Sequence, residues 1–237
     1  SGYQVSFFAY SDNRKDWVVG LGYYSYRRPD NSYDWSIDPE LELKPATNVS
    51  LTISPSFGKN IEGMQYVGAV EDQLAASTFG KRYIFGELDQ TTFSAGIRLN
   101  WTFTPKLSLQ LYVQPLISSG KYTNIKELTR PASYDFSVYG ENGSTINNDT
   151  KEIDPDGSGP AQPFSINNPD FNFKSLRGNA VLRWEYLPGS VLYFVWTQSR
   201  SDFEDVGDFQ FKKSVNRLWE SKPDNIFMIK FTYWLNM

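Results

Sequence analysis

The chain has 237 residues, a net charge of -4, and neither cysteine nor histidine. Those absences exclude Ser-His-Asp and Cys-His catalysis, and zinc sites with histidine or cysteine ligands. The mildly acidic balance, without a basic stripe, argues against nucleic acid as a partner.

The mean hydropathy is -0.48, and no stretch reaches the roughly 18 consecutive apolar residues that a membrane-spanning helix needs. Aromatic residues nevertheless make up 16% of the chain. This combination is typical of strands that alternate apolar and polar residues. A lipid-embedded form of the chain would therefore be a β-barrel.

Apolar and polar residues alternate with a period of two along the N-terminal half, which predicts strands with two different faces. The predicted strands cover residues 5–9, 17–26, 35–43, 49–57, 66–70 and 82–88. In the third of these, Asp38, Glu40 and Glu42 form an acidic row opposite an apolar row. An acidic row must face water, which in a barrel means the lumen.

The alternation is most regular in the C-terminal half. Strands are predicted there over residues 93–103, 107–113, 176–186, 191–198 and 225–237. Their polar rows carry Arg98, Arg177, Arg183, Glu185 and Lys230, so these side chains are also predicted to face the lumen. The last strand alternates up to Met237, which is expected of the strand that closes a transmembrane barrel.

The connections between the strands are of two lengths. Short turns at residues 45–46, 105–106 and 188–189 contrast with long polar loops at 117–174 and 201–223. Counting back from a periplasmic C-terminus places the short turns on the periplasmic side and both long loops outside the cell, as in outer-membrane barrels. The sequence thus predicts an all-β fold, an antiparallel transmembrane β-barrel domain over residues 1–237 with about 11 strands.

An odd strand number and a strand-like first segment predict further strands upstream of Ser1. The expected location is the bacterial outer membrane. The expected partners are outer-membrane lipid and the barrel-assembly machinery.

The charged lumen residues admit two interpretations. Glu40, Glu42 and Glu185 could supply the two carboxylates of a glycosidase, which lie roughly 5 to 9.5 Å apart. Alternatively, the acidic residues form ion pairs with the four basic lumen residues, because a polar barrel interior must balance its charges. The second interpretation is favoured.

The long loop carries a candidate calcium site. Asp149, Asp154, Asp156 and Ser158 place oxygen ligands close together in a glycine-rich segment, and calcium takes six to eight such ligands. The distal glutamate of an EF-hand is missing. A pair of Asp-Pro and Asp-Gly turns explains the same residues, so calcium is a possible cofactor and no other cofactor is predicted.

The same loop contains Tyr134, Phe136 and Tyr139. These aromatic side chains could stack on a carbohydrate ligand, or the loop could fold inward and plug the lumen. A loop packed around a small core of its own is the favoured interpretation.

Several segments are similar to a known family. They are RWEYLPGS (183–190), VWTQ (195–198), PKLSLQLYVQP (105–115), ASYDFSVYG (132–140) and DPDGSGPA (154–161). From about Val49 onward the chain resembles the C-terminal outer-membrane barrel domain, domain-of-unknown-function family 5916, of bacterial proteins with an N-terminal carbohydrate-binding module of family 9 type. The resemblance implies a barrel that anchors or serves a sugar-binding module, in glycan binding or uptake. A glycan hydrolase that uses carboxylates, and a structural subunit of an envelope complex, are the alternatives.

Overall fold

The computed structural model describes residues 2–235, and it shows an all-β chain with one short α-helix. The long strands are β1 (Tyr3–Tyr10), β2 (Trp17–Arg27), β3 (Tyr33–Ala46), β4 (Val49–Glu71), β5 (Lys81–Thr104), β6 (Leu107–Leu128), β11 (Phe171–Leu187), β12 (Ser190–Glu204) and β13 (Asp224–Thr232). The short elements are η1 (Ala76–Thr78), β7 (Phe136–Val138), β8 (Thr145–Ile146), β9 (Glu152–Asp154), β10 (Phe164–Ser165) and α1 (Phe211–Glu220).

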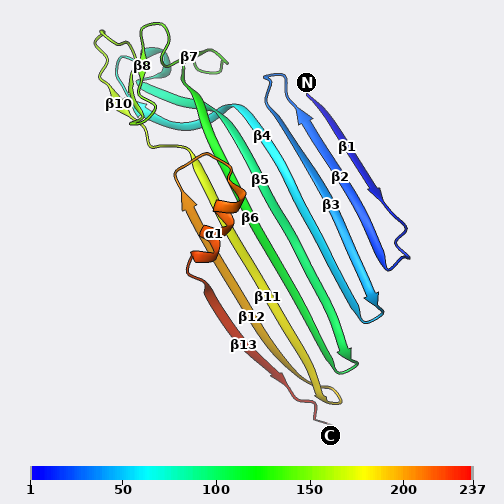
Figure 1. The fold of residues 1–237 in the computed structure, drawn as a ribbon. Coiled ribbons are helices and arrows are strands. Elements are labelled where there is room, and N and C mark those ends of the chain that lie inside the picture. Colours follow the sequence, from blue (N-terminus) through cyan, green and yellow to red (C-terminus); the bar gives the residue numbers. More distant parts are fainter. Residues whose placement is uncertain (1, 236–237) are drawn as a thin grey trace.

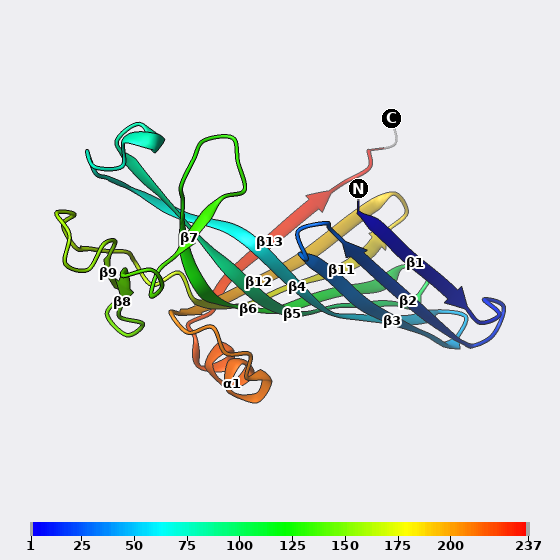
Figure 2. The same cartoon turned by 90° about the horizontal axis from the view of Figure 1, so that it is seen from above.

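The long strands form one antiparallel sheet in the order β1-β2-β3-β4-β5-β6-β11-β12-β13, and β7 adds to β6 (Figure 1). Neighbouring strands in the sheet are also consecutive long strands in the chain. Within residues 2–235 the sheet is not closed, because β1 and β13 are its two edges. Figure 2 shows that the sheet curves like a trough, with α1 on its convex side.

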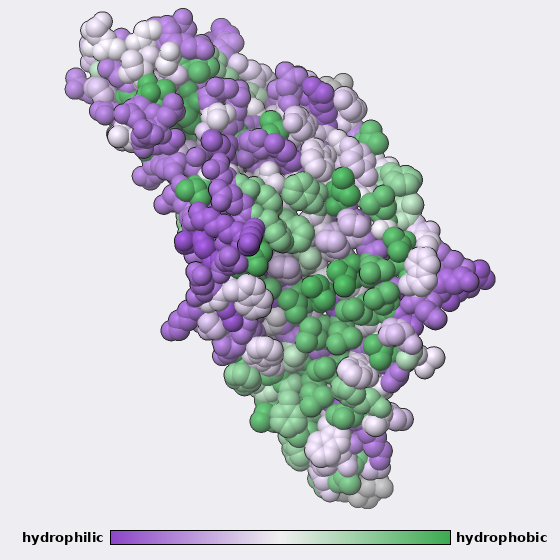
Figure 3. Space-filling view, in the orientation of Figure 1, coloured by the Kyte–Doolittle hydropathy of each residue, from purple (hydrophilic) through white to green (hydrophobic). Residues whose placement is uncertain are grey.

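The two faces of the trough follow from the alternation in the sequence, since successive side chains of a strand point to opposite faces. One ladder of directly paired residues crosses six strands and is apolar throughout: Leu51, Leu99, Leu111, Ala180, Trp196 and Phe227. Apolar side chains gather over the convex face (Figure 3). The intervening polar rows therefore line the concave face.

The two ends of the sheet differ. Tight turns join β3 to β4, β5 to β6 and β11 to β12 at the end near the C-terminus, called the turn end below (Figure 1). At the opposite end, the loop end, residues 129–170 form a lobe with a second sheet of β8, β9 and β10. The main buried apolar cluster lies where this lobe packs on the loop ends of β5 and β6, and it consists of Ile84, Ile125, Tyr139 and Ile153.

The predicted number of strands is wrong. Residues 49–57 and 66–70 belong to one strand, β4, and residues 82–88 and 93–103 belong to β5, so nine long strands replace the predicted eleven. The register of β4 against β5 shifts between Glu62 and Gln65 and again between Tyr66 and Gly68. Such bulges reverse the alternation locally, and the interruption makes one long strand resemble two short ones.

The long loops are shorter than predicted. β6 continues to Leu128 and β11 begins at Phe171, so the irregular segment is 129–170 rather than 117–174. In the segment predicted as the loop 201–223, β12 continues to Glu204 and α1 forms. The predicted closing strand ends early, because β13 stops at Thr232, and residues 236 and 237 of that prediction lie outside the described residues.

No helix within residues 2–235 has the length and apolar character needed to cross a bilayer.

Candidate functional site on the concave face

An acidic stripe runs along β3 on the concave face. Asp38, Glu40 and Glu42 occupy alternate positions of this strand, so their side chains share one face. Asp38 accepts hydrogen bonds from Ser36 (2.7 Å) and Ser56 (2.5 Å). In the same stripe, Ser54 donates to Glu40 (3.0 Å), and Lys44 forms an ion pair with Glu42 (3.0 Å).

The predicted basic lumen residues lie on other strands. Arg98 is on β5, Arg177 and Arg183 are on β11, and Lys230 is on β13. The Arg98 guanidinium lies over the ring of Tyr112, 5.4 Å from its centroid. Lys230 lies 5.8 Å over Tyr193.

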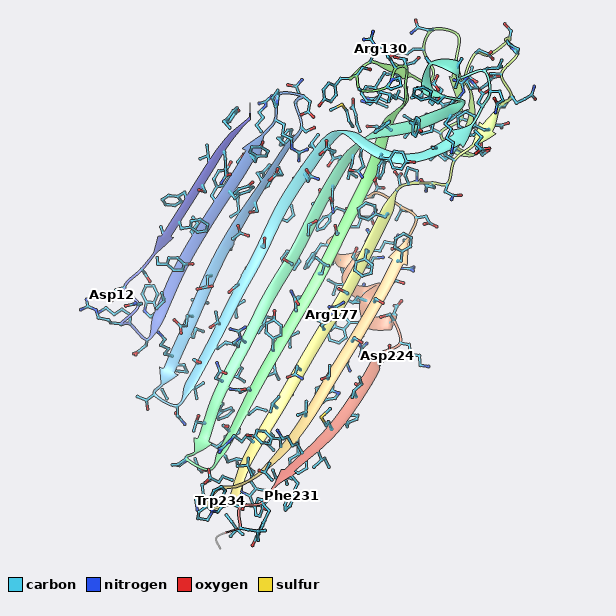
Figure 4. All side chains as sticks on the ribbon, turned by 180° about the vertical axis from the view of Figure 1, so that it is seen from behind. Asp12, Arg130, Arg177, Asp224, Phe231 and Trp234 are labelled. Atoms are coloured by element: carbon cyan, nitrogen blue, oxygen red, sulfur yellow. The ribbon has the colours of Figure 1, made fainter. Side chains whose placement is uncertain are left out.

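Arg177 is in the middle of the concave face (Figure 4). Its guanidinium has no ion pair or side-chain hydrogen bond within residues 2–235. Arg183 bonds to Glu185 at 3.1 Å. This is the one ion pair that forms among the eight predicted lumen residues within the described part of the chain.

Charge is therefore separated across the concave face, with the acidic stripe on β3 and the cations on β5, β11 and β13. β4, β5 and β6 lie between β3 and β11, which at about 4.8 Å per strand places Glu185 roughly 19 Å from β3. That spacing is too long for a glycosidase pair between Glu185 and Glu40. Glycan hydrolysis stays a prediction that rests on Glu40 and Glu42, neighbours on one strand.

A hollow of about 240 Å³ opens in the middle of the concave face. Its polar lining comes from Arg98, Asn100, Gln110, Tyr112 and Asn179. Its edges are fixed by hydrogen bonds from Asn100 to Ser50 (3.3 Å) and from Asn179 to Thr197 (2.9 Å). A guanidinium, three amides and an aromatic ring are groups that bind the hydroxyls and the ring faces of a polar ligand.

Sequence reasoning identified Arg98 and missed the rest of this hollow. Asn100, Tyr112 and Asn179 belong to the same polar rows, so the alternation contains the signal that they face the same side. Bringing them together requires the register, in which Arg98 pairs with Tyr112 and Tyr112 with Asn179.

One family model, described as "Domain of unknown function (DUF5916)", matches residues 1–237. The chain belongs to this family. The match also covers the residues before Val49, to which the resemblance in the sequence segments did not extend. No curated protein and no solved structure matches this DUF5916 domain.

The predicted calcium residues of the DUF5916 domain form a capped turn in the lobe. Asp154 accepts backbone hydrogen bonds from Gly157 (2.8 Å) and Asp156 (3.3 Å). Asp156 accepts one from Ala161 (3.0 Å), while the amide of Asp149 donates to Asn147 (2.9 Å). Within residues 2–235, no group of three or more acidic side chains converges to hold a metal ion. Calcium binding by Asp149, Asp154, Asp156 and Ser158 stays a prediction, and these contacts favour turn capping.

The three predicted loop aromatics of the DUF5916 domain have different surroundings. Tyr134 is 83% exposed, whereas Tyr139 is 5% exposed and belongs to the core of the lobe. Phe136 packs edge-on against Phe85, with ring centroids 5.3 Å apart. The lobe therefore has a small core of its own, and of these three rings Tyr134 is the one available for stacking on a ligand.

A buried polar network supports the core of the lobe. Arg82 forms ion pairs with Asp72 and Glu127, each at 2.7 Å. Tyr139 donates its hydroxyl to Glu127 (3.0 Å). Burial, and next the charge of Glu127, raise the pKa of the Tyr139 phenol, so this hydroxyl stays protonated and keeps donating.

Proposed function

We propose that the DUF5916 domain is part of a transmembrane β-barrel in the bacterial outer membrane, with its C-terminus in the periplasm. The convex apolar face carries the proposal. On β5 the apolar positions from Phe93 to Phe103 span ten residue steps, or about 34 Å along the strand. At a tilt of roughly 40° this projects to about 26 Å, close to the roughly 25 Å apolar band of outer-membrane barrels.

The exposure of large side chains supports lipid as the solvent of this face. Phe194 is 41%, Phe227 75% and Ile229 67% exposed, and soluble monomers rarely expose contiguous apolar patches of more than a few hundred square ångströms. Near the turn end, Trp184, Tyr186 and Phe231 form an aromatic cluster, with centroid distances of 6.2 and 5.6 Å. Aromatic girdles at this position are typical of the membrane interface.

The open edges β1 and β13 are consistent with the same role. In lipid each backbone donor and acceptor needs a partner, so both edges are expected to pair with further strands. The alternation of short and long connections supports the orientation, because outer-membrane barrels keep short turns in the periplasm and long loops outside.

For the concave face, the proposed role is non-enzymatic: the barrel anchors and serves a carbohydrate-binding module, and a glycan passes into or binds at the hollow around Arg98. The lining of this hollow with a guanidinium, amides and an aromatic ring supports a hydroxyl-rich ligand. The resemblance to barrels joined to such modules supports the choice of a glycan.

Two adjacent residues of β5 test the lipid-facing assignment. Leu99→Arg places a charge on the convex face in the middle of the apolar band, and is expected to destabilise the lipid-inserted domain by about 2–4 kcal/mol. Asn100→Arg places the same charge on the concave face, and is expected to cost less than about 1 kcal/mol. Urea titration of unfolding in phosphatidylcholine vesicles measures both. An equal or larger cost for Asn100→Arg would exclude lipid contact on the convex face.

The glycan role has a separate test. On a glycan array probed with the full-length protein in detergent, Arg98→Leu is expected to weaken binding by at least about tenfold, because a charged hydrogen-bond donor is lost. The matched control is Arg130→Leu, which alters an arginine that is 70% exposed on the lobe. Unchanged binding by the Arg98 variant would remove the hollow from the proposal.

A further inference from the structure

A strap formed by residues 205–223 crosses the convex face at the loop end and includes α1. Its first half is fixed by backbone contacts: Asn168 donates to the carbonyl of Asp205, and Asn172 donates to that of Asp208, both at 2.9 Å. Two aromatic contacts pack the strap against the sheet: Phe209 contacts Phe57 on β4, and Phe211 contacts Phe93 on β5. Phe57 and Phe93 are the residues of the apolar rows nearest to the loop end, so the strap lies at the loop-end border of the apolar band on the convex face.

One flank of α1 is held by ion pairs to the end of β12. Arg217 pairs with Asp202 (2.8 Å), and Lys213 pairs with Glu204 (3.1 Å). Beneath them Lys174, which is fully buried, bonds to both carboxylates at 2.9 and 2.7 Å. Lys213 and Arg217 are four residues apart, so this whole flank of the helix faces the acidic end of β12.

The other flank faces the apolar band. This flank carries Trp219, which is 61% exposed. The guanidinium carbon of Arg200 lies over its ring, 5.1 Å from the centroid. Arg200 also donates to the carbonyl of Trp219 at 2.7 Å. Since Arg200 precedes Asp202 and Glu204 along β12, which runs from the turn end to the loop end, the Trp219 flank lies nearer to the band than the ion-paired flank.

Cations without an ion-pair partner lie on this membrane-side flank and beside it, on β12 and just past the end of α1. Lys212 and Lys222 are exposed and have no ion-pair partner within residues 2–235, and Arg200 bonds to neutral oxygen atoms there. A shallow hollow of about 660 Å³ lies on the exposed side of the helix. Its lining is Gln210, Phe211, Lys212, Lys213, Asn216, Arg217 and Glu220, so it extends over the ion-paired residues as well as Lys212.

We propose that the membrane-side flank of α1 binds the phosphate of an anionic lipid headgroup. The proposal rests on the lipid-inserted barrel proposed above. Charge complementarity identifies the occupant, because unpaired lysine and arginine side chains at the border of an apolar band are the groups that hold lipid phosphates. An exposed tryptophan beside them matches the headgroup level, where tryptophan is enriched.

The test compares the full-length protein in nanodiscs of phosphatidylcholine alone with nanodiscs of equal parts phosphatidylcholine and phosphatidylglycerol. Hydrogen exchange of the amides in residues 211–220 reports the binding. In the wild type, exchange is expected to slow by about fivefold for each lysine engaged by the anionic lipid, or roughly 25-fold for Lys212 and Lys222 together. The double variant Lys212→Glu, Lys222→Glu is expected to show no difference between the two lipids.

Two controls separate the site from general electrostatics. Lys81→Glu alters a lysine at the start of β5, at the loop end of the sheet, and is expected to keep the full response, as is the conservative variant Lys212→Arg. Equal exchange of residues 211–220 in both lipids for the wild type overturns the headgroup site. Unprotected amides throughout β5 in both lipids would show that the domain does not insert, which overturns the barrel proposal and the headgroup site together.

Discussion

The buried lysine under α1 gives the sharpest stability prediction. Lys174→Met keeps the length and volume of the side chain and removes its charge. The wild-type ammonium is fully buried and makes two charge-assisted hydrogen bonds, to Asp202 (2.9 Å) and Glu204 (2.7 Å). Removing one partner of a buried ion pair costs about 3–5 kcal/mol, because the remaining charge loses its compensation.

The expected cost is smaller than this for Lys174→Met, because the two carboxylates are partly exposed and have other cationic partners. The Asp202 and Glu204 side chains keep 20% and 16% of their exposure, and each retains a second cation, Arg217 or Lys213. We therefore expect a loss of about 2–3 kcal/mol, confined to the strap that these ion pairs hold. This corresponds to roughly 30- to 150-fold faster opening of α1.

Hydrogen exchange of residues 211–220 in detergent micelles measures this opening. The matched control is Lys121→Met, because Lys121 is 57% exposed and lies 3.9 Å from Asp208, so its loss is expected to change exchange by less than about twofold. An equally small change for Lys174→Met would refute the assignment of the buried lysine as the group that holds α1.

Two further predictions concern the same strap. Gly207→Ala is expected to lower the free energy of opening of the strap by about 1–3 kcal/mol, because an added Cβ would lie 2.6 Å from the Cα of Lys121 and 2.9 Å from the carbonyl oxygen of Gly120. The control is Gly68→Ala, where nothing lies within 4 Å of the added Cβ. Equal hydrogen exchange of α1 in the two variants would contradict the expected clash. Acid is also expected to release α1. Hydrogen bonds from Arg217 and then Lys174 lower the pKa of Asp202 from 3.8 to about 2, so its stabilisation is complete above about pH 4 and is lost as the pH falls through about 2. Protection of α1, corrected for intrinsic exchange, should drop by roughly thirtyfold between pH 5 and pH 2. A pH-independent protection would contradict this coupling.

Much of the fold follows from the alternation of residues, because a period of two assigns each side chain to a face without knowledge of its neighbours. Asp38 and Arg98 were predicted to share the lumen side, and both lie on the concave face. The alternation does not determine strand length once a bulge intervenes. The shifts after Glu62 and Tyr66 reverse the phase inside β4, and this is why β4 was predicted as two strands. In β5 the polar residues 89–92 interrupt the apolar row instead.

The register across strands was not available from the sequence, and it decides which predicted residues meet. The hollow around Arg98 depends on a lateral row, from Arg98 to Tyr112 to Asn179, whose members are far apart in the chain. The expected ion pairs across the lumen fail for the same reason. Glu42 and Arg98 share a lateral row but have Thr52 of β4 between them, and the other cations are on β11 and β13, so only Arg183 and Glu185, two residues apart, meet.

The burial of Lys174 under the strap is still harder to predict from the sequence. Lys174 lies in a segment predicted as a polar loop, where a lysine is normally solvated. It is buried because residues 205–223 return over the sheet and cover it, and because Asp202 and Glu204 lie on the paired strand β12. The helix itself spans ten residues, too short to be stable without tertiary contacts, so its formation depends on the same ion pairs. The burial of Lys174 depends on the strap, and the helix in the strap depends on the ion pairs around Lys174, so neither can be predicted from its own segment of the sequence. The headgroup site proposed for the opposite flank of α1 forms only when the strap and these ion pairs are both in place.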